Sequence, residues 1–81
     1  MKVHGPLEDT VQGKTVWYVQ VLTDDGRHAE RGTQESSEKY TIMIRIHLWA
    51  RDNATGQHFA GDGRHYFWNK ADALKARLAL G

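Results

Sequence analysis

The sequence predicts an α+β fold in which a four- or five-stranded antiparallel β-meander carries one C-terminal α-helix packed on one face. Two segments carry this prediction. Tyr40–Arg51 alternates apolar residues with polar or cationic ones, a pattern typical of a long strand with one dry and one wet face. Lys70–Leu80 has the apolar spacing and the end signals of a helix that packs on a sheet.

The N-terminal third predicts the first strands of the meander. Residues 1–14 hold few large apolar side chains, so we expect an arm or a short edge strand there. Thr15–Thr23 is dense in β-branched and aromatic residues and is predicted to be a strand. Asp25-Gly26 favours a type I′ turn, which would return Arg27–Thr33 as a polar edge strand. That register sets Arg31 opposite Gln20 and Glu30 opposite Val21.

The middle of the chain predicts the central strand. Gln34–Lys39 is polar and predicts a mobile connection into this strand. The dry face of Tyr40–Arg51 consists of its even positions, which are Tyr40, Ile42, Ile44, Ile46, Leu48 and Ala50. At about 3.3 Å per residue, a strand of this length spans roughly 40 Å and crosses a small domain.

Two further strands follow the central one. Asp52–Gly56 is predicted to be a turn that returns the chain as Gln57–Ala60. This return sets Phe59 opposite Ala50 on the dry face and His58 opposite Arg51 on the wet face. Arg64–Trp68 is predicted to be a short last strand, and the sequence leaves open which faces Tyr66, Phe67 and Trp68 occupy.

The predicted C-terminal helix has a signal at each end. Asn69 can accept a backbone N–H as the N-cap of Lys70–Leu80, and Gly81 favours the C-terminal stop. We expect the helix to pack on the dry face of the sheet through an apolar stripe of Ala71, Leu74 and Leu78.

Length and composition predict one small domain over residues 1–81, with no internal repeat. The chain has no cysteine, so neither disulfides nor a Cys-based zinc site can support the fold. The net charge of +1 argues against a function that depends on bulk charge, such as that of an acidic nucleic-acid mimic. The sequence shows no apolar run long enough for a membrane span and no signal-peptide core, so we expect a soluble, cytoplasmic protein with no membrane partner.

The wet face of the predicted central strand is the candidate partner-binding site. Arg45, His47, Trp49 and Arg51 would line up about 6.6 Å apart, and His58 would join them across a hairpin. Because one helix covers only one face of a sheet, this row would stay open. Trp and Arg dominate protein hot spots, and such a face can also stack bases and hold phosphates. The row could instead lie under the N-terminal arm and have no direct role.

The same residues suggest two chemical alternatives. His47, His58 and Asp62 could converge on one face, but no paired-histidine or cysteine spacing supports a metal site, so we expect none. His47 as a general base, with Arg45 or Arg51 stabilising charge, would suit a small ribonuclease, although no second titrating partner lies at a fixed distance. We therefore expect no catalytic residue and no cofactor.

Two resemblances rest on the order of elements. The last forty residues, a strand followed by an Asn69-capped, alanine-rich helix, resemble in outline the three-stranded arm-binding domains of phage integrases. In size and plan the chain is similar to small accessory proteins of phages and other mobile elements, including anti-CRISPR inhibitors. That likeness implies action by covering a surface of a larger machine, and neither resemblance assigns a functional residue.

These observations predict a non-enzymatic interaction module that docks its cationic-aromatic sheet face onto a protein partner, as a small phage accessory or inhibitor protein would. The alternatives are a sheet-based nucleic-acid-binding domain and a small ribonuclease-like enzyme. An open sheet face or edge could also serve self-association.

Overall fold

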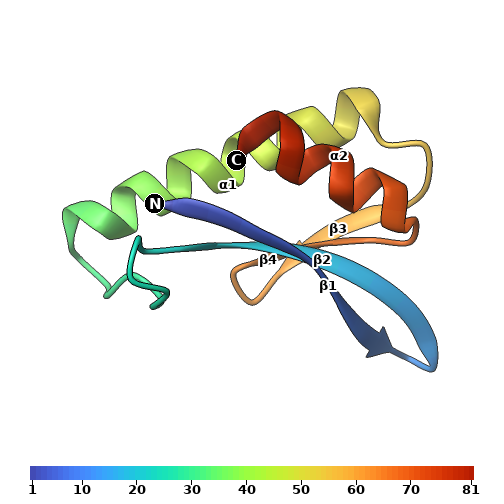
Figure 1. Cartoon of the computed structure of the whole chain (residues 1–81), viewed down its shortest axis with the longest axis horizontal. Coiled ribbons are helices and arrows are strands. Elements are labelled where there is room, and N and C mark those ends of the chain that lie inside the picture. Colours follow the sequence, from blue (N-terminus) through green and yellow to red (C-terminus); the bar gives the residue numbers. More distant parts are fainter.

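The computed structural model describes all 81 residues, which fold in the order β-β-α-β-β-α. Its elements are β1 (Lys2–Val11), β2 (Lys14–Leu22), α1 (Gln34–Asn53), β3 (His58–Gly61), β4 (Arg64–Phe67) and α2 (Lys70–Leu80). The strands form one antiparallel sheet in the order β1-β2-β4-β3. Both helices lie on the same face of this sheet (Figure 1), so the opposite face has no covering element.

The predicted α+β class and antiparallel sheet are confirmed, whereas the meander and the single helix are wrong. In a meander each strand pairs with the next, but here β2 pairs with β4. The reason is that α1 carries the chain from β2 across the sheet to its far edge at β3.

The segment predicted as the central strand is instead the larger part of α1. Its alternating apolar residues divide into two rows with a spacing of four residues, which is close to one helical turn. The row that packs toward the sheet is Ile42, Ile46 and Ala50, and the row that stays exposed is Tyr40, Ile44 and Leu48. A helix of 20 residues is about 30 Å long and fits the 33 Å longest extent of the molecule, whereas a strand of roughly 40 Å would not.

The start of α1 has a clear signal in the sequence. Thr33 is the N-cap: its hydroxyl oxygen accepts a hydrogen bond from the Ser36 backbone N–H at 3.2 Å. Glu35 adds a negative charge to the first turn, where the helix dipole favours it. The prediction of a mobile connection at Gln34–Lys39 is therefore wrong, because these residues form the first turns of the helix.

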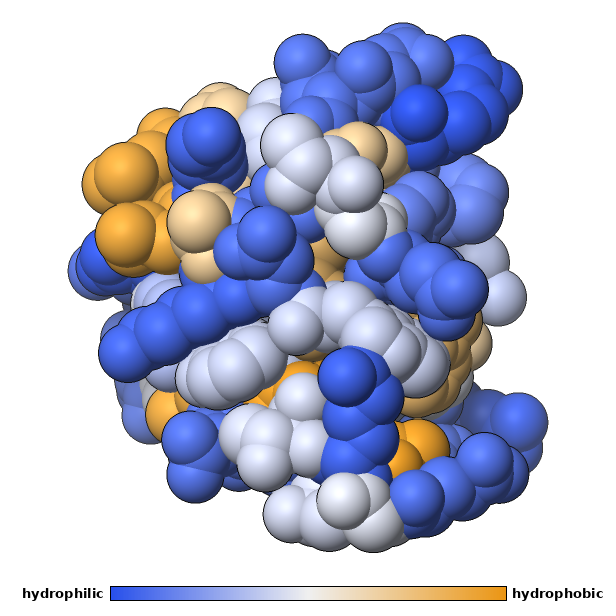
Figure 2. All heavy atoms as spheres, turned by 90° about the vertical axis from the view of Figure 1, so that its right-hand side faces the viewer, coloured by the Kyte–Doolittle hydropathy of each residue, from blue (hydrophilic) through white to orange (hydrophobic).

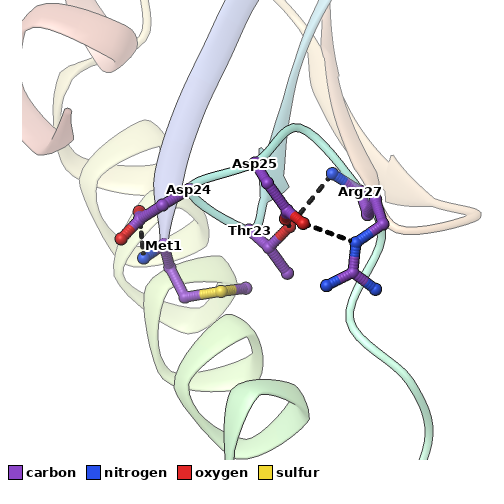
Figure 3. Close-up of polar contacts among 5 residues, drawn as sticks. All are labelled: Met1, Thr23, Asp24, Asp25 and Arg27. Atoms are coloured by element: carbon purple, nitrogen blue, oxygen red, sulfur yellow. Dashed lines mark hydrogen bonds and ion pairs between the residues drawn. The ribbon is translucent and has the colours of Figure 1, made fainter.

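The predicted turn at Asp25-Gly26 is confirmed in place but not in type, since only Gly26 has a positive φ, of 83°. Figure 3 shows how side chains close this turn. The Thr23 hydroxyl donates to the Asp25 carboxylate, and Arg27 donates from Nε to the same carboxylate at 2.8 Å. These two hydrogen bonds lower the pKa of Asp25. Beside the turn, the ammonium group of Met1 pairs with Asp24 at 2.9 Å.

No strand follows this turn, so the predicted edge strand Arg27–Thr33 is wrong. The pairings of Arg31 with Gln20 and of Glu30 with Val21 do not form. β4 occupies that edge of β2 instead, with Arg64 opposite Gln20. Residues 27–33 therefore serve as the connection into α1.

Residues 1–14 form an edge strand rather than an arm. β1 is ten residues long and pairs with β2, and the turn residues Gln12 and Gly13 have φ angles of 51° and 78°. A bulge between His4 and Leu7 interrupts the register. At this bulge Gly5, with φ 133°, passes closely over the backbone of Tyr18.

The C-terminal elements β3, β4 and α2 lie where the sequence predicts them. The Asn69 side chain accepts the Ala71 N–H at 2.9 Å, and the Gly81 N–H donates to the Arg77 carbonyl at 2.7 Å. Both predicted helix ends are thus confirmed.

Two predictions for this region are wrong. β3 pairs with β4, so Phe59 lies opposite Tyr66 and His58 opposite Phe67, and neither pairs with the segment 40–51. The predicted stripe on α2 also faces away from the sheet, because Leu74 and Leu78 are exposed. The helix packs on the sheet through small residues instead, with Ala73 and Ala76 fully buried and Leu80 beside them.

The chain folds as two similar halves, each a β-hairpin followed by a helix. The hairpin turns adopt nearly the same backbone conformation: φ is 51° and 78° at Gln12-Gly13, and 51° and 74° at Asp62-Gly63. The inner strands β2 and β4 pair antiparallel, with Trp17 opposite Phe67. These two residues are fifty positions apart in the chain, as are the matching residues of the two hairpin turns. An approximate two-fold axis therefore passes through the centre of the sheet, although the sequence shows no repeat.

One buried carboxylate joins the end of α1 to the start of α2. Asp72 is 1% exposed and accepts hydrogen bonds from the backbone N–H groups of Thr55 at 2.9 Å and Gly56 at 3.0 Å. Burial opposes ionisation of this group, but its hydrogen bonds outweigh that effect, so the pKa of Asp72 lies below its ordinary value. The contact ties the loop between α1 and β3 to the first turn of α2.

Candidate interaction surfaces

The structure disperses the row predicted to bind a partner. Alternate residues of a helix lie about 200° apart around its axis, so Arg45 and Trp49 project from one side of α1 and His47 and Arg51 from another. Arg45 is exposed, whereas Trp49 packs partly against the core. Arg51 is exposed and pairs with Asp52 at 3.2 Å. His58 lies on β3, where its ring centroid is 6.2 Å from that of His47.

A groove of about 580 Å³ runs between α1 and the β3–β4 hairpin. A single face of α1 forms one bank, with lining residues at helical spacing: Ser36, Lys39, Tyr40, Met43, Ile44 and His47. The opposite bank consists of Ala60, Gly61, Gly63 and Arg64, and Ala29 and Arg31 complete the lining. The volume falls within the range of ligand-binding clefts.

The groove is positively charged. Two lining residues, Arg31 and Lys39, offer cationic groups to the groove, and none of the 12 lining residues carries a carboxylate. Arg64 also lines the groove, but its guanidinium lies over the Tyr18 ring on the opposite face of the sheet. Arg64 pairs with Asp9 at 3.6 Å, but Arg31 and Lys39 form no ion pair. Lys39 extends across the groove, because a Cβ built on Gly63 would lie 3.3 Å from its Nζ. Lys39 Nζ also lies 3.4 Å from His28 Nδ1, but neither Lys39 nor Arg31 has a carboxylate partner, so both can meet an anionic group.

An exposed apolar row runs along the rim of this groove. Tyr40, Ile44 and Leu48 are 72%, 53% and 42% exposed, and their spacing of four residues places them on one side of α1. Apolar surface also gathers elsewhere: Figure 2 shows hydrophobic atoms at the upper left of one side of the molecule, among mostly hydrophilic ones. A contiguous apolar row beside a cleft is typical of a surface that a partner covers.

Three histidines from three elements meet where α1 lies against the hairpin. His58 Nδ1 and His65 Nε2 are 2.9 Å apart, and the ring centroid of His47 lies 5.8 Å from that of His65. His65 is fully buried and its Nδ1 has no hydrogen-bond partner. Because a buried N–H without an acceptor is costly, we assign the His65 proton to Nε2, which then donates to His58.

Burial and the neighbouring histidines determine the protonation of this cluster. Desolvation of the buried ring, together with the charges that His58 and His47 can carry, lowers the pKa of His65 to about 4. His65 is therefore neutral at physiological pH. No group of three or more His, Cys, Asp or Glu side chains in the structure is placed to hold a metal ion.

No family model, curated protein or solved structure matches the chain. Neither helix is long and apolar enough to cross a membrane.

Sequence reasoning missed most of the groove, although the signal for one bank was present. Lys39, Met43 and His47 recur every four residues in a segment without glycine or proline, and this spacing indicates a helical face. The opposite bank had no signal, because the hairpin residues Gly61 to Arg64 meet α1 only through the tertiary fold.

The sequence predicted an open sheet face but assigned it to the wrong residues, and the structure shows which faces the aromatic residues of β4 occupy. Phe67 points toward the helices and is fully buried. Tyr66 and Trp68 point to the opposite face, where both approach Phe59, with ring centroids 4.8 Å and 5.5 Å away. An aromatic sheet face therefore exists, but it consists of other residues than the predicted row.

Proposed function

We propose that this domain is a non-enzymatic interaction module whose groove binds an acidic, partly apolar segment of a protein partner. One observation carries the proposal: a concave site with unpaired cations and no carboxylate lies beside an exposed apolar row on the same helix. The proposal keeps the expected kind of partner and moves the binding site from the predicted row to the groove.

The chemistry of the groove supports an amphipathic acidic segment. Met43 and Ile44 supply apolar surface within the groove, and Tyr40, a residue type enriched in hot spots, stands at its rim. Arg31 and Lys39 provide charge for Asp or Glu side chains at the edge. Because Arg31 is exposed and Lys39 is only partly buried, their charges would mainly speed association and select the register, while burial of the apolar row supplies affinity.

The ribonuclease alternative receives less support from the geometry. Its general base, His47, would need an arginine beside it to stabilise developing charge. Arg45 projects from another side of α1, and Arg51 is paired with Asp52. We therefore favour binding without catalysis. A role as a phage accessory or inhibitor protein stays a prediction that co-purification from the native host would test.

Selection from a random peptide library tests the proposed function without knowledge of the partner. The expected result is enrichment of peptides that combine Asp or Glu with Leu, Ile or Phe. Amide chemical-shift changes on adding such a peptide should map to α1 and the β3–β4 hairpin.

Matched variants would localise the binding. Lys39→Glu and Ile44→Asp should each weaken binding of a selected peptide by about tenfold or more, because one reverses a rim charge and the other removes apolar contact. Lys75→Glu, an equal charge reversal on the exposed side of α2, should leave binding unchanged. Equal loss in the Lys75 variant, or shifts that map to the open sheet face, would overturn the proposal.

A further inference from the structure

The face of the sheet opposite the helices carries a continuous row of large side chains. The register places Phe59 opposite Tyr66, Tyr66 opposite Tyr18, and Tyr18 opposite Leu7. The row therefore crosses all four strands, and its side chains share one face because paired residues in a sheet project the same way. Both helices lie on the other face (Figure 1), so no element of the chain covers this row.

The aromatic rings stack on one another and leave their outer members partly open. Phe59 and Tyr66 stack with centroids 4.8 Å apart and an angle of 12° between planes, and Trp68 meets Phe59 edge-on at 72°. Tyr66 at the centre is 7% exposed, whereas Tyr18, Phe59 and Trp68 are only partly buried. A planar ligand can thus extend the stack at its ends.

The same face has an excess of positive charge. Strand alternation places Lys2, Lys14 and Arg64 on it, against a single carboxylate, Asp9. Lys14 Nζ lies 5.9 Å from the centre of the Trp68 ring, and the Arg64 guanidinium lies 4.3 Å from that of Tyr18. Although the whole chain has a net charge of only +1, cations on this face stand beside the aromatic rings.

We propose that this open sheet face is a second binding surface, and that it binds single-stranded nucleic acid. Unpaired bases would stack on Trp68 and Phe59 and on the Arg64 guanidinium that covers Tyr18, and phosphates would contact Lys14 and Lys2. Aromatic rings interleaved with cations provide both interactions that single strands require. A duplex is a poorer ligand, because its bases are already stacked and this flat face offers no helix to enter a groove.

This surface and the groove lie on opposite sides of the sheet and share only Arg64, whose guanidinium lies on the open face. A protein ligand is the competing occupant, since Trp, Tyr and Arg also form protein hot spots. The local charge decides for nucleic acid: three cations face one carboxylate, and that carboxylate is already paired with Arg64 at 3.6 Å.

Fluorescence anisotropy of labelled oligo(dT) and oligo(U) of about 20 nucleotides tests the proposal, because single-strand sites span up to that length. We expect saturable binding at low salt that weakens steeply as salt is added. A duplex of equal length should bind more weakly. No anisotropy change up to about 100 µM protein would overturn the proposal, because non-specific binders are detected below that concentration.

Variants separate this face from the groove. Trp68→Ala should weaken binding by about tenfold, the loss expected for one stacked base. Lys14→Glu, at an exposed position that leaves the fold intact, should also weaken it and reduce the salt dependence. The groove variant Lys39→Glu should bind oligonucleotides as the wild type does. If Lys39→Glu weakens binding as much as Lys14→Glu, nucleic acid contacts the groove and the proposal is wrong.

Discussion

At the scale of single residues, Gly5 is required by the bulge at which β1 passes close to the backbone of β2. Its φ of 133° is unfavourable for other residues, and an added Cβ would lie 2.6 Å from the Tyr18 carbonyl oxygen. Gly5→Ala should therefore lower the free energy of unfolding by about 2 kcal/mol or more. Gly13→Ala is the matched control. Gly13 also has a positive φ, of 78°, but a Cβ added there would meet no other atom within 4 Å, so the substitution should cost about 1 kcal/mol. Urea denaturation measures both, and equal losses would contradict the steric argument.

His65 should make the stability of the domain depend on pH. Its pKa is about 4 in the folded protein and 6.5 when unperturbed, so between these values the unfolded chain binds the proton more readily. This contribution is fully present above about pH 6.5 and is lost as the pH falls toward 4, by about 3 kcal/mol in all.

Urea midpoints across this pH range check the prediction, with His65→Leu as the comparison. The variant lacks the titrating group, so its stability should change less over the same range. His47 and His58 face His65 and are present in both proteins, so the difference between the two curves is the quantity to compare. Parallel curves would show that His65 does not cause the acid sensitivity.

At the scale of elements, α1 offers a direct test of the helical packing. Ile44 is 53% exposed and Ile46 is fully buried, although both belong to the same apolar set in the alternating pattern. Ile44→Asp should change stability by about 0.5 kcal/mol or less, whereas Ile46→Asp should unfold the domain by placing a charge in the core. Circular dichroism and thermal melts distinguish the two. A strand would require both substitutions to unfold the protein.

The strand prediction for α1 failed for an identifiable physical reason. A residue set spaced by two contains every residue spaced by four, so the alternation from Tyr40 to Ala50 also includes a helical row. The three isoleucines favoured the strand, because β-branched residues prefer sheets. Tertiary packing overrides that preference here. The start signal at Thr33 and the absence of glycine between Thr33 and Gly56 agree with the helix.

Local signals predicted the remaining elements better than they predicted the surfaces. β2, α2 and the turn at Gly61-Asp62-Gly63 depend on neighbouring residues, so the sequence indicates them directly. The groove and the aromatic face depend on which strands pair. Tyr18 and Tyr66 are 48 positions apart and become neighbours only because β2 pairs with β4. No pattern within either strand contains that information.

At the scale of the whole molecule, the two ββα halves suggest that chain connectivity can be changed. Gly81 lies beside Val3, since a Cβ built on Gly81 would be 3.5 Å from that of Val3. A circular permutant that joins Gly81 to Met1 through about four glycine and serine residues, and opens between His28 and Ala29, should keep the fold. The opened segment contains no strand or helix. Amide spectra would check this, and a collapsed, poorly dispersed spectrum would show that the connection before α1 is needed for folding.

The bulge in β1 also affects how copies of the molecule meet. The rim along β1 is interrupted where Gly5 bends the backbone and Pro6 supplies no amide hydrogen, and the rim along β3 is only four residues long. An edge strand that pairs with a strand of another molecule needs an unbroken series of main-chain donors and acceptors. We therefore expect fibril growth to be disfavoured at both edges of the sheet, and contacts with other molecules to be made mainly by side chains.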